Sequence, residues 1–114
     1  PGLRNPDIQY HFGPCFYLDH GFVKPGGAGM AVVPVLLRPQ SRGTIRLRSR
    51  NPFDPPVIDP RYLTEEADWQ PLETGVLLAR EIVRQPAFDP FRGEPVYQEE
   101  DPKEHIRKMG ETIY

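Results

Sequence analysis

Prolines are spread along the whole chain and limit the length of every helix or strand that it can form. There are 15 of them in 114 residues, well above the average usage of about 5%. A proline fixes its own φ and has no N–H, so it interrupts regular helices and central strands. Here the prolines alternate with apolar runs, which a disordered segment lacks. We therefore expect a folded unit of short elements joined by fixed loops.

The composition restricts the class of protein and the class of partner. Hydrophobic residues make up 38% of the chain and charged residues 26%, which is ordinary for a globular domain. A net charge of −2 gives no reason to expect nucleic acid or an anionic membrane as a partner. The longest apolar run, residues 30–37, is too short to span a bilayer. The single cysteine, Cys15, has no second cysteine with which to form an internal disulfide.

Three segments have the pattern of β-strands. Residues 7–12 alternate apolar and polar side chains, and residues 30–37 are a continuous apolar run interrupted by Pro34. Residues 44–50 again alternate with period two. We expect the second and third segments to pair as a hairpin. Residues 51–60, with four prolines, are expected to be a rigid connector.

A first helix is predicted to begin near Thr64, a residue suited to the N-cap. An apolar stripe with helical spacing follows it, formed by Trp69, Leu72, Val76, Ala79 and Val83. Pro71 conflicts with an uninterrupted helix, so we expect either a kink there or a short turn followed by a restart. Gln85 and Pro86 should end the helix.

A second helix is predicted after Asp101, which is followed by Pro102 and Glu104 in the pattern of a capped N-terminus. Gly110 is expected to end this helix, and residues 112–114 to begin another strand. The fold class that follows for residues 1–114 is α+β: a mainly antiparallel sheet with helices packed on one face, forming a partial domain.

Glycines and histidines are the first candidates for chemistry. The glycine-rich residues 26–29 are followed by a strand-like run, whereas a dinucleotide loop requires a helix there. His11, His20 and His105 are far apart and lack the spacing of metal ligands. His105 lies in a highly charged segment and is expected to be exposed. His11 lies on the polar side of its strand, as either a satisfied histidine or a site residue.

Arginines gather around the third strand segment, at positions 38, 42, 46, 48 and 50. They are interpreted either as a solvated strand face that pairs with carboxylates of another domain, or as a stripe that contacts an anionic partner. The second interpretation gives the alternative function of an independent binding module.

An ordered set of motifs resembles the C-terminal region of the glucose–methanol–choline (GMC) flavin oxidoreductases, in particular their choline- and alcohol-dehydrogenase branch. The motifs are residues 6–12, 37–43, 58–63, 80–83, 85–88, 105–107 and 112–114. In that family this region forms the substrate-binding part, which packs against a Rossmann-type FAD domain. The flavin accepts a hydride from an alcohol, and a histidine takes the hydroxyl proton.

The resemblance also implies roles for individual residues. His11 matches a histidine that lines the substrate cavity and supports the developing alkoxide, and Ile113 and Tyr114 would approach the same cavity. The catalytic histidine is expected directly after Tyr114, so the chain is expected to contain no catalytic, cofactor-binding or metal-binding residue. Residues 16–29 match no family pattern, which leaves the identity of the alcohol open.

The leading hypothesis is therefore a piece of an FAD-dependent alcohol oxidoreductase that supplies part of the cavity wall. Its expected partners are the FAD-binding domain, which is not in this sequence, and a small alcohol. The first residue, Pro1, is not methionine, and we expect further residues before it. Alone, the chain is expected to bind no FAD and to oxidise no alcohol. We also expect self-association through apolar surface that a neighbouring domain would cover.

Overall fold

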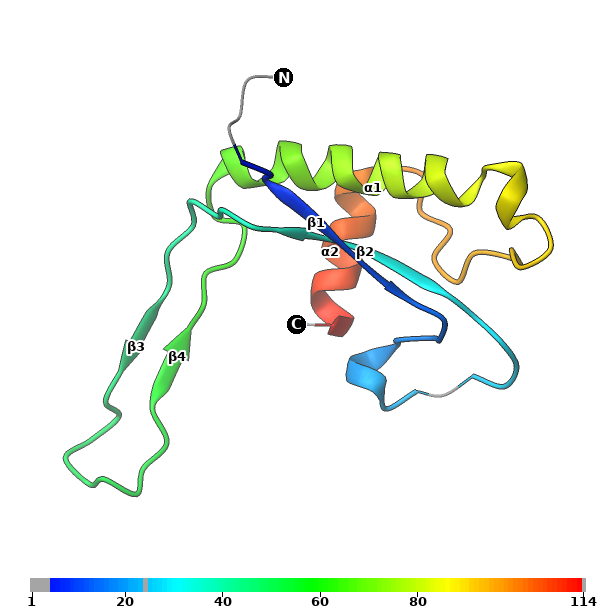
Figure 1. The fold of residues 1–114 in the computed structure, drawn as a ribbon. Coiled ribbons are helices and arrows are strands. Elements are labelled where there is room, and N and C mark those ends of the chain that lie inside the picture. The colour runs from blue at the N-terminus through cyan, green and yellow to red at the C-terminus, as the bar shows by residue number, and fades with distance from the viewer. Residues whose placement is uncertain (1–4, 24, 114) are drawn as a thin grey trace.

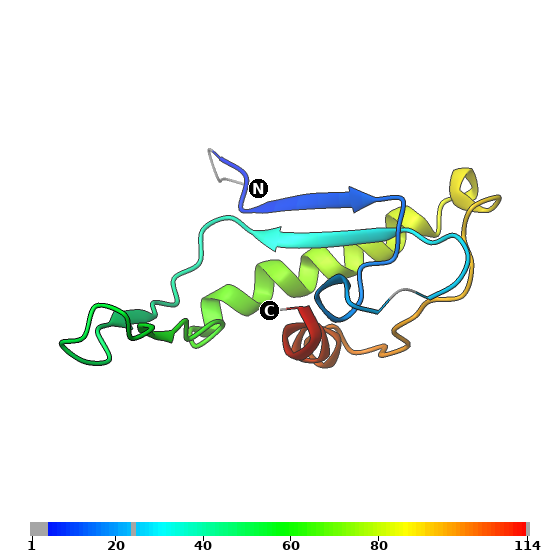
Figure 2. The same cartoon turned by 90° about the horizontal axis from the view of Figure 1, so that it is seen from below.

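A computed structural model describes residues 5–23 and 25–113 and has the expected α+β class (Figure 1). In these residues the strands are β1 (Ile8–Gly13), β2 (Ala31–Leu36), β3 (Thr44–Arg46) and β4 (Val57–Asp59), and the α-helices are α1 (Trp69–Val83) and α2 (Pro102–Ile113). Short 3₁₀ turns cover Asp19–Gly21, Glu66–Asp68 and Pro86–Phe88. Both α-helices lie on the same side of the β1–β2 pair, as Figure 2 shows.

The two long strands, β1 and β2, form an antiparallel pair whose register runs from Ile8 opposite Leu36 to Gly13 opposite Ala31. Both strands were predicted from the sequence, but the pairing of the second with residues 44–50 was wrong. Pro34 lies inside β2. Each strand of a two-stranded sheet has one edge without a partner strand, so a proline, which has no N–H to donate, is tolerated there.

The shorter strands, β3 and β4, pair with each other and form what we call the arm, residues 42–62, which projects away from the rest of the chain (Figure 1). The predicted strand 44–50 is ordered as a strand only to Arg46, and the predicted connector 51–60 contains β4. At the base of the arm, a Cβ atom on Gly43 would lie 2.2 Å from the carbonyl oxygen of Asp59. The two strands can approach so closely there because position 43 has no side chain.

The first helix, α1, starts at Trp69 and not near Thr64. The Thr64 hydroxyl donates to the carbonyl of Arg61 at 3.2 Å, so it does not cap the helix. A 3₁₀ turn at Glu66–Asp68 precedes α1, and Pro71 then occupies its first turn, where no intrahelical donor is required. The predicted short turn and restart are therefore confirmed, as is the end of the helix before Pro86.

The small core lies between α1 and the β1–β2 pair. Val76 and Ala79 are the buried hydrophobic residues of the described chain, with 5% and 7% exposure, and both belong to the predicted apolar stripe. A Cβ atom on Gly75 would lie 2.9 Å from Pro34 Cβ, so the missing side chain lets helix and strand pack closely. The Tyr10 hydroxyl donates to the Gly75 carbonyl at 3.0 Å and joins β1 to the same turn of α1.

The second helix, α2, begins as predicted, since the backbone N–H of Lys103 donates to Asp101 Oδ1 at 3.2 Å. It then continues through Gly110 to Ile113, so the predicted stop was wrong, and so was the predicted strand at residues 112 and 113. A glycine ends a helix when it adopts a left-handed conformation with positive φ. Gly110 does not have a positive φ, so the helix continues past it. Tyr114 lies outside the described residues.

The chain is open and extended. It exposes 9,099 Å², whereas a compact monomer of 13.1 kDa exposes about 6,400 Å². Its radius of gyration is 17.2 Å, against about 13 Å for a compact domain of this length. This shape agrees with a partial domain.

Candidate functional site

His11 lies on the face of β1 that is turned away from α1. The neighbouring Tyr10 reaches α1 through its hydroxyl, and successive side chains of a strand point to opposite faces. His11 is exposed, and it shares its face with its register partner Val33. None of the described helices covers this face (Figure 2), so the imidazole is available to a ligand or to another polypeptide.

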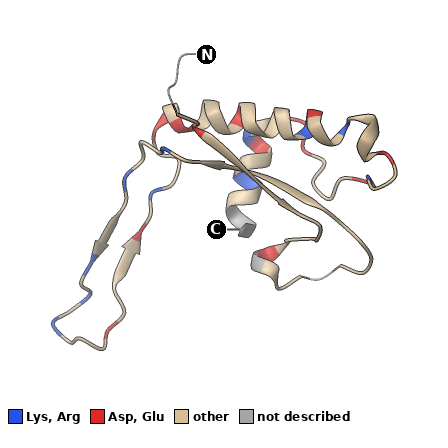
Figure 3. Ribbon diagram, in the orientation of Figure 1, with Lys and Arg blue, Asp and Glu red and all other residues tan. Residues whose placement is uncertain are grey.

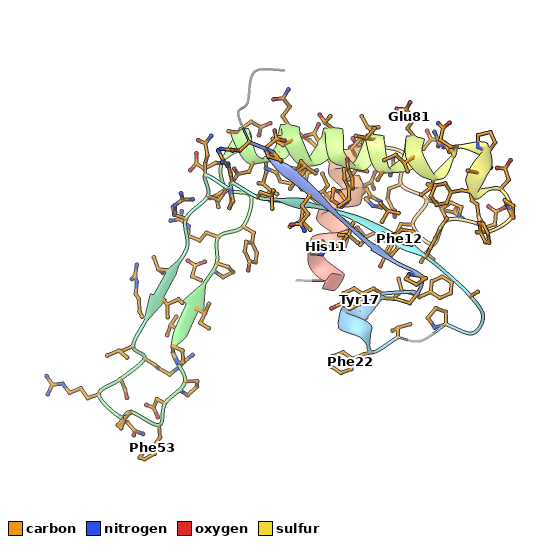
Figure 4. The ribbon with its side chains drawn as sticks, viewed as in Figure 1. His11, Phe12, Tyr17, Phe22, Phe53 and Glu81 are labelled. Carbon is orange, nitrogen blue, oxygen red and sulfur yellow. The ribbon has the colours of Figure 1, made fainter. Side chains whose placement is uncertain are left out.

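Aromatic side chains follow His11 along the chain. Figure 4 shows Phe12 at the end of β1 and Tyr17 and Phe22 on the loop beyond it. Their exposed fractions are 58%, 46% and 84%. Ring faces of this kind bind cations as well as apolar groups. Phe12 directly follows His11 in β1, so its side chain points to the opposite face of the strand, and the loop that carries Tyr17 and Phe22 lies on the helix side of the sheet, beside α2.

The loop after β1 is held by local contacts. A bridge joins Leu18 and Val23 around the 3₁₀ turn Asp19–Gly21, and the loop encloses a hollow of about 340 Å³ lined by residues that include Phe16 and Gly29. Helix α2 contacts this 3₁₀ turn, and both views show the two side by side (Figures 1 and 2). The loop and α2 therefore border one region of the molecule.

The other two predicted site residues are at the end of α2. Ile113 is its last residue, but its side chain lies outside the described part of the structure, as does the whole of Tyr114. Their approach to the cavity that His11 is predicted to line stays a prediction.

The glycine-rich residues 26–29 do not fit a dinucleotide. They lead directly into strand β2, whereas the pyrophosphate of FAD requires the N-terminus of a helix after the glycines. Described side chains of His, Cys, Asp and Glu also form no group of three that could hold a metal ion. None of the described helices is long and apolar enough to cross a membrane.

Asp68, which the sequence analysis did not identify, ties the arm to the start of α1. Its side chain is 1% exposed; Oδ1 accepts from the Gln40 N–H at 2.7 Å, and Oδ2 accepts from the N–H and hydroxyl of Ser41 at 2.9 and 2.5 Å. Burial acts to raise the pKa of Asp68, but these hydrogen bonds, with the charge of Arg42, hold the pKa below its ordinary value. Asp68 is therefore a charged anchor that turns the chain out of β2 toward the arm.

A second unexpected cluster joins α2 to the segment before it. Glu99 Oε1 pairs with Lys108, and Glu99 Oε2 lies 4.0 Å from Nδ1 of His105. These last two atoms are buried and, among the described residues, have no hydrogen-bond partner. Burial and the nearby Arg80 lower the pKa of His105, against the opposing charge of Glu99. His105 was predicted to be exposed, and that was wrong, because α2 packs this side of its charged segment inward.

Arg80 reinforces the same cluster from α1. Its guanidinium donates to the carbonyls of Glu100 and Glu99 at 2.7 and 2.5 Å. The segment that leads into α2 is therefore fastened to α1 through its backbone.

The predicted arginine stripe follows the arm (Figure 3). Arg42 donates to the carbonyls of Pro39 and Ser41, and Arg48 Nε donates to the carbonyl of Pro55 at 3.2 Å. These two side chains support the backbone. The stripe is not one strand face, because β3 ends at Arg46.

Comparison with known proteins gives consistent relatives. Residues 39–114 match the C-terminal family described as GMC oxidoreductase. The chain is 43% identical over 107 residues to the mitochondrial choline dehydrogenase of Homo sapiens, which covers 94% of this chain and 17% of that protein. It is 37% identical over 128 residues to the oxygen-dependent choline dehydrogenase of Pseudomonas fluorescens, covering 100% of this chain and 21% of the relative. The chain thus spans about a fifth of the length of these relatives.

Proposed function

Because this chain belongs to the GMC oxidoreductase family, we propose that it forms one wall of the substrate cavity in an FAD-dependent enzyme that oxidises a small alcohol. The observation that carries the proposal is the position of His11, which is exposed on a sheet face that none of the described helices covers (Figures 2 and 4). The relatives named above are choline dehydrogenases, and choline combines a hydroxyl group with a quaternary ammonium.

His11 supplies polarity at this wall. An imidazole N–H that donates to the substrate oxygen stabilises the negative charge that develops there when the hydroxyl proton leaves. Phe12, Tyr17 and Phe22 present ring faces, and quaternary ammonium groups are bound by such faces. His11 would meet the hydroxyl end of the substrate from its own face of the sheet, and Ile113 and Tyr114 are proposed to approach the same cavity; the rings lie on the other side of the β1–β2 pair and are exposed to a ligand or domain on that side.

The remainder of the active site is assigned to polypeptide outside this sequence. The flavin would be held by the FAD-binding domain, because residues 26–29 do not fit a dinucleotide. The proton-accepting histidine is proposed to follow Tyr114. Alone, this chain is proposed to bind no FAD and to oxidise no alcohol.

A chimera tests the proposal. The chain replaces the matching segment of human choline dehydrogenase, and choline oxidation is measured for the chimera, for its H11A variant and for E81A as a control on an exposed side chain of α1. We expect H11A to lower kcat/KM about 100-fold, which is within the loss seen when one oxyanion donor is removed, with flavin content and E81A activity unchanged. Full activity of H11A, or flavin absorbance in the purified chain alone, would contradict the proposal.

The alternative, an independent module that recognises an anionic partner, rests on the arginines of the arm. Heparin is a suitable probe, because binding through arginines weakens steeply as salt rises. The commitment of Arg42 and Arg48 to backbone carbonyls leaves fewer guanidinium groups for such a partner than the sequence suggested. We therefore favour the oxidoreductase role.

A further inference from the structure

Two polar atoms inside the molecule lie close together without a hydrogen bond between them. Glu99 Oε2 and Nδ1 of His105 are 4.0 Å apart, and both are buried without a hydrogen-bond partner among the described residues. The two side chains are 12% and 20% exposed, so segments of this chain already enclose them. A carboxylate and an unprotonated Nδ1 are both acceptors. Protonation of His105 therefore changes a contact in the interior of the molecule.

The charges around this pair come from three segments of the chain. Arg80 of α1 donates to the carbonyl of Glu99 at 2.5 Å, and Lys108 of α2 pairs with Oε1 of the same residue. Among the described residues, the charges that act on the imidazole of His105 are those of Arg80, Glu99 and Lys108. The ring of Tyr97 meets the imidazole edge-on, with 5.8 Å between the centroids. A protonated His105 is thus a third cation around one carboxylate.

Protonation of His105 is unfavourable in these surroundings. Burial and the charge of Arg80 lower the pKa of His105 and outweigh the attraction of Glu99. Because Glu99 already pairs with Lys108, its charge is shared before the imidazole gains a proton. A buried cation that is not fully compensated destabilises the packing that buries it. The contact of α2 with α1 should therefore be weaker when His105 is charged.

The rest of the attachment of α2 is shallow, since none of its described side chains is fully buried. Lys103 pairs with Glu66 and Glu73 of the first helical region at 2.9 and 3.5 Å. Glu66 is 83% exposed, and ion pairs in contact with water contribute little. A helix of 12 residues that loses its packing is itself marginal in water. A modest loss of interaction at His105 can therefore release and unfold α2.

We propose that the cluster of Arg80, Glu99, His105 and Lys108 is a pH-sensitive switch. Helix α2 stays packed on α1 while His105 is neutral, and it is released when His105 takes a proton. The 3₁₀ turn Asp19–Gly21 contacts α2, so the loop after β1 should lose this support at the same time. The β1–β2 pair and the arm contain no member of the cluster and should keep their structure. This proposal does not depend on the role proposed for His11.

The fluorescence of Trp69 tests the proposal in the chain itself. Trp69 is the single tryptophan, and two cationic groups of α2, Lys103 Nζ and Arg107 Cζ, lie 5.8 and 5.5 Å from the centroid of its ring. Release of α2 should therefore change the emission. We expect a change between about pH 7.5 and pH 5 that follows the NMR titration of His105. Since one proton is involved, the equilibrium between packed and released α2 can shift by at most about tenfold per pH unit.

Three variants separate the switch from a general effect of acid. H105Q has no titrating side chain at this position, so it should remove the change in emission. K108Q leaves the whole charge of Glu99 to His105, so acid should release α2 less than in the wild type. K103Q is the matched control, a lysine of the same helix that pairs with Glu66 and Glu73 instead. It should loosen α2 at every pH and leave the pH dependence unchanged.

Hydrogen exchange in the choline dehydrogenase chimera gives a measurement within a complete enzyme. After correction for the intrinsic exchange rate, the α2 amides should exchange several-fold faster at about pH 5.5 than at about pH 7.5, because release of α2 exposes them to solvent. The amides of β1 and β2 should not change, and H105Q should remove the difference. Circular dichroism at the higher pH first confirms that each variant folds.

Three outcomes would overturn the proposal: α2 exchange in the chimera that does not depend on pH, a full response in H105Q, or slower exchange of α2 at the lower pH. The last result would mean that the charged imidazole binds Glu99 and tightens the helix instead. Choline oxidation by the chimera at one fixed pH reports on His11 independently of these results.

Discussion

Replacement of Asp68 by asparagine is the most direct test of how the arm is attached. The substitution preserves size but removes the charge and one of the two acceptor oxygens. If the remaining oxygen keeps the bonds from Ser41, the new amide group faces the N–H of Gln40, and two donors then oppose each other. The site has 1% exposure, so water cannot readily replace the lost acceptor.

The expected loss in unfolding free energy follows from these contacts. A hydrogen bond to a charged group contributes about 1.5–3 kcal/mol, and an unsatisfied buried donor costs about 1–3 kcal/mol. Because both estimates describe the same Gln40 contact, they are not added, and we expect D68N to lower the free energy of unfolding by about 2–3 kcal/mol. This is a large share of the 5–15 kcal/mol typical of domains.

Urea unfolding at one fixed protein concentration measures this loss, with E81Q as the control carboxylate on α1. The pH dependence gives a second readout. Since the pKa of Asp68 is lowered in the fold, its contribution is present above the unfolded value of about 3.9 and is lost as pH falls through the lower folded value. The difference in the free energy of unfolding between wild type and D68N should therefore be constant near neutral pH and should shrink below about pH 4. A loss under about 0.5 kcal/mol, or a difference equally large at pH 3, would refute the reasoning.

Two further predictions concern packing and protonation. G75A should lower the free energy of unfolding by roughly 1 kcal/mol, because a clash with Pro34 outweighs the helix-propensity gain; G110A, which meets no atom within 4 Å, should raise it by roughly 0.5–1 kcal/mol. Urea unfolding checks both, and a G75A chain as stable as wild type would contradict the close packing. His105 should titrate below about pH 6.5 by NMR, so its stabilising effect is present above that pH and is lost as pH falls through the folded pKa. The free energy of unfolding of an H105Q variant should depend less on pH between pH 5 and 7 than that of the wild type. A His105 pKa above 6.5 would show that the charge of Glu99 outweighs burial and Arg80.

The sequence predicted the elements whose signals are local. Three such signals depend only on residues close together in the sequence: the proline at the start of the second helix, the apolar stripe from Trp69 to Val83, and the alternation in β1. The structure contains all three elements. The motif set also identified the family, which the comparison over residues 39–114 confirms.

The pairing of strands depended on contacts that sequence patterns do not reveal. Residues 30–37 and 44–50 are close in sequence, which favoured a hairpin, but the anchor at Asp68 is 27 residues from Ser41 and turns the chain away. The burial of His105 likewise depends on Arg80 and Glu99 from other segments. The local signal of Asp68, an acidic residue immediately before α1, indicates a helix cap, but its carboxylate makes no capping bond and accepts from the distant Gln40 and Ser41 instead.

Gly43 gives the arm a mechanical property. The backbone of residue 43 closely approaches Asp59 at the base of the arm. About ten residues at roughly 3.3 Å each, or about 33 Å, separate this base from Phe53. A rotation of about 10° at the base of the arm would therefore displace the tip by roughly 6 Å. The position of the Phe53 ring therefore depends strongly on the orientation of the base of the arm, which Asp68 fixes through Gln40 and Ser41.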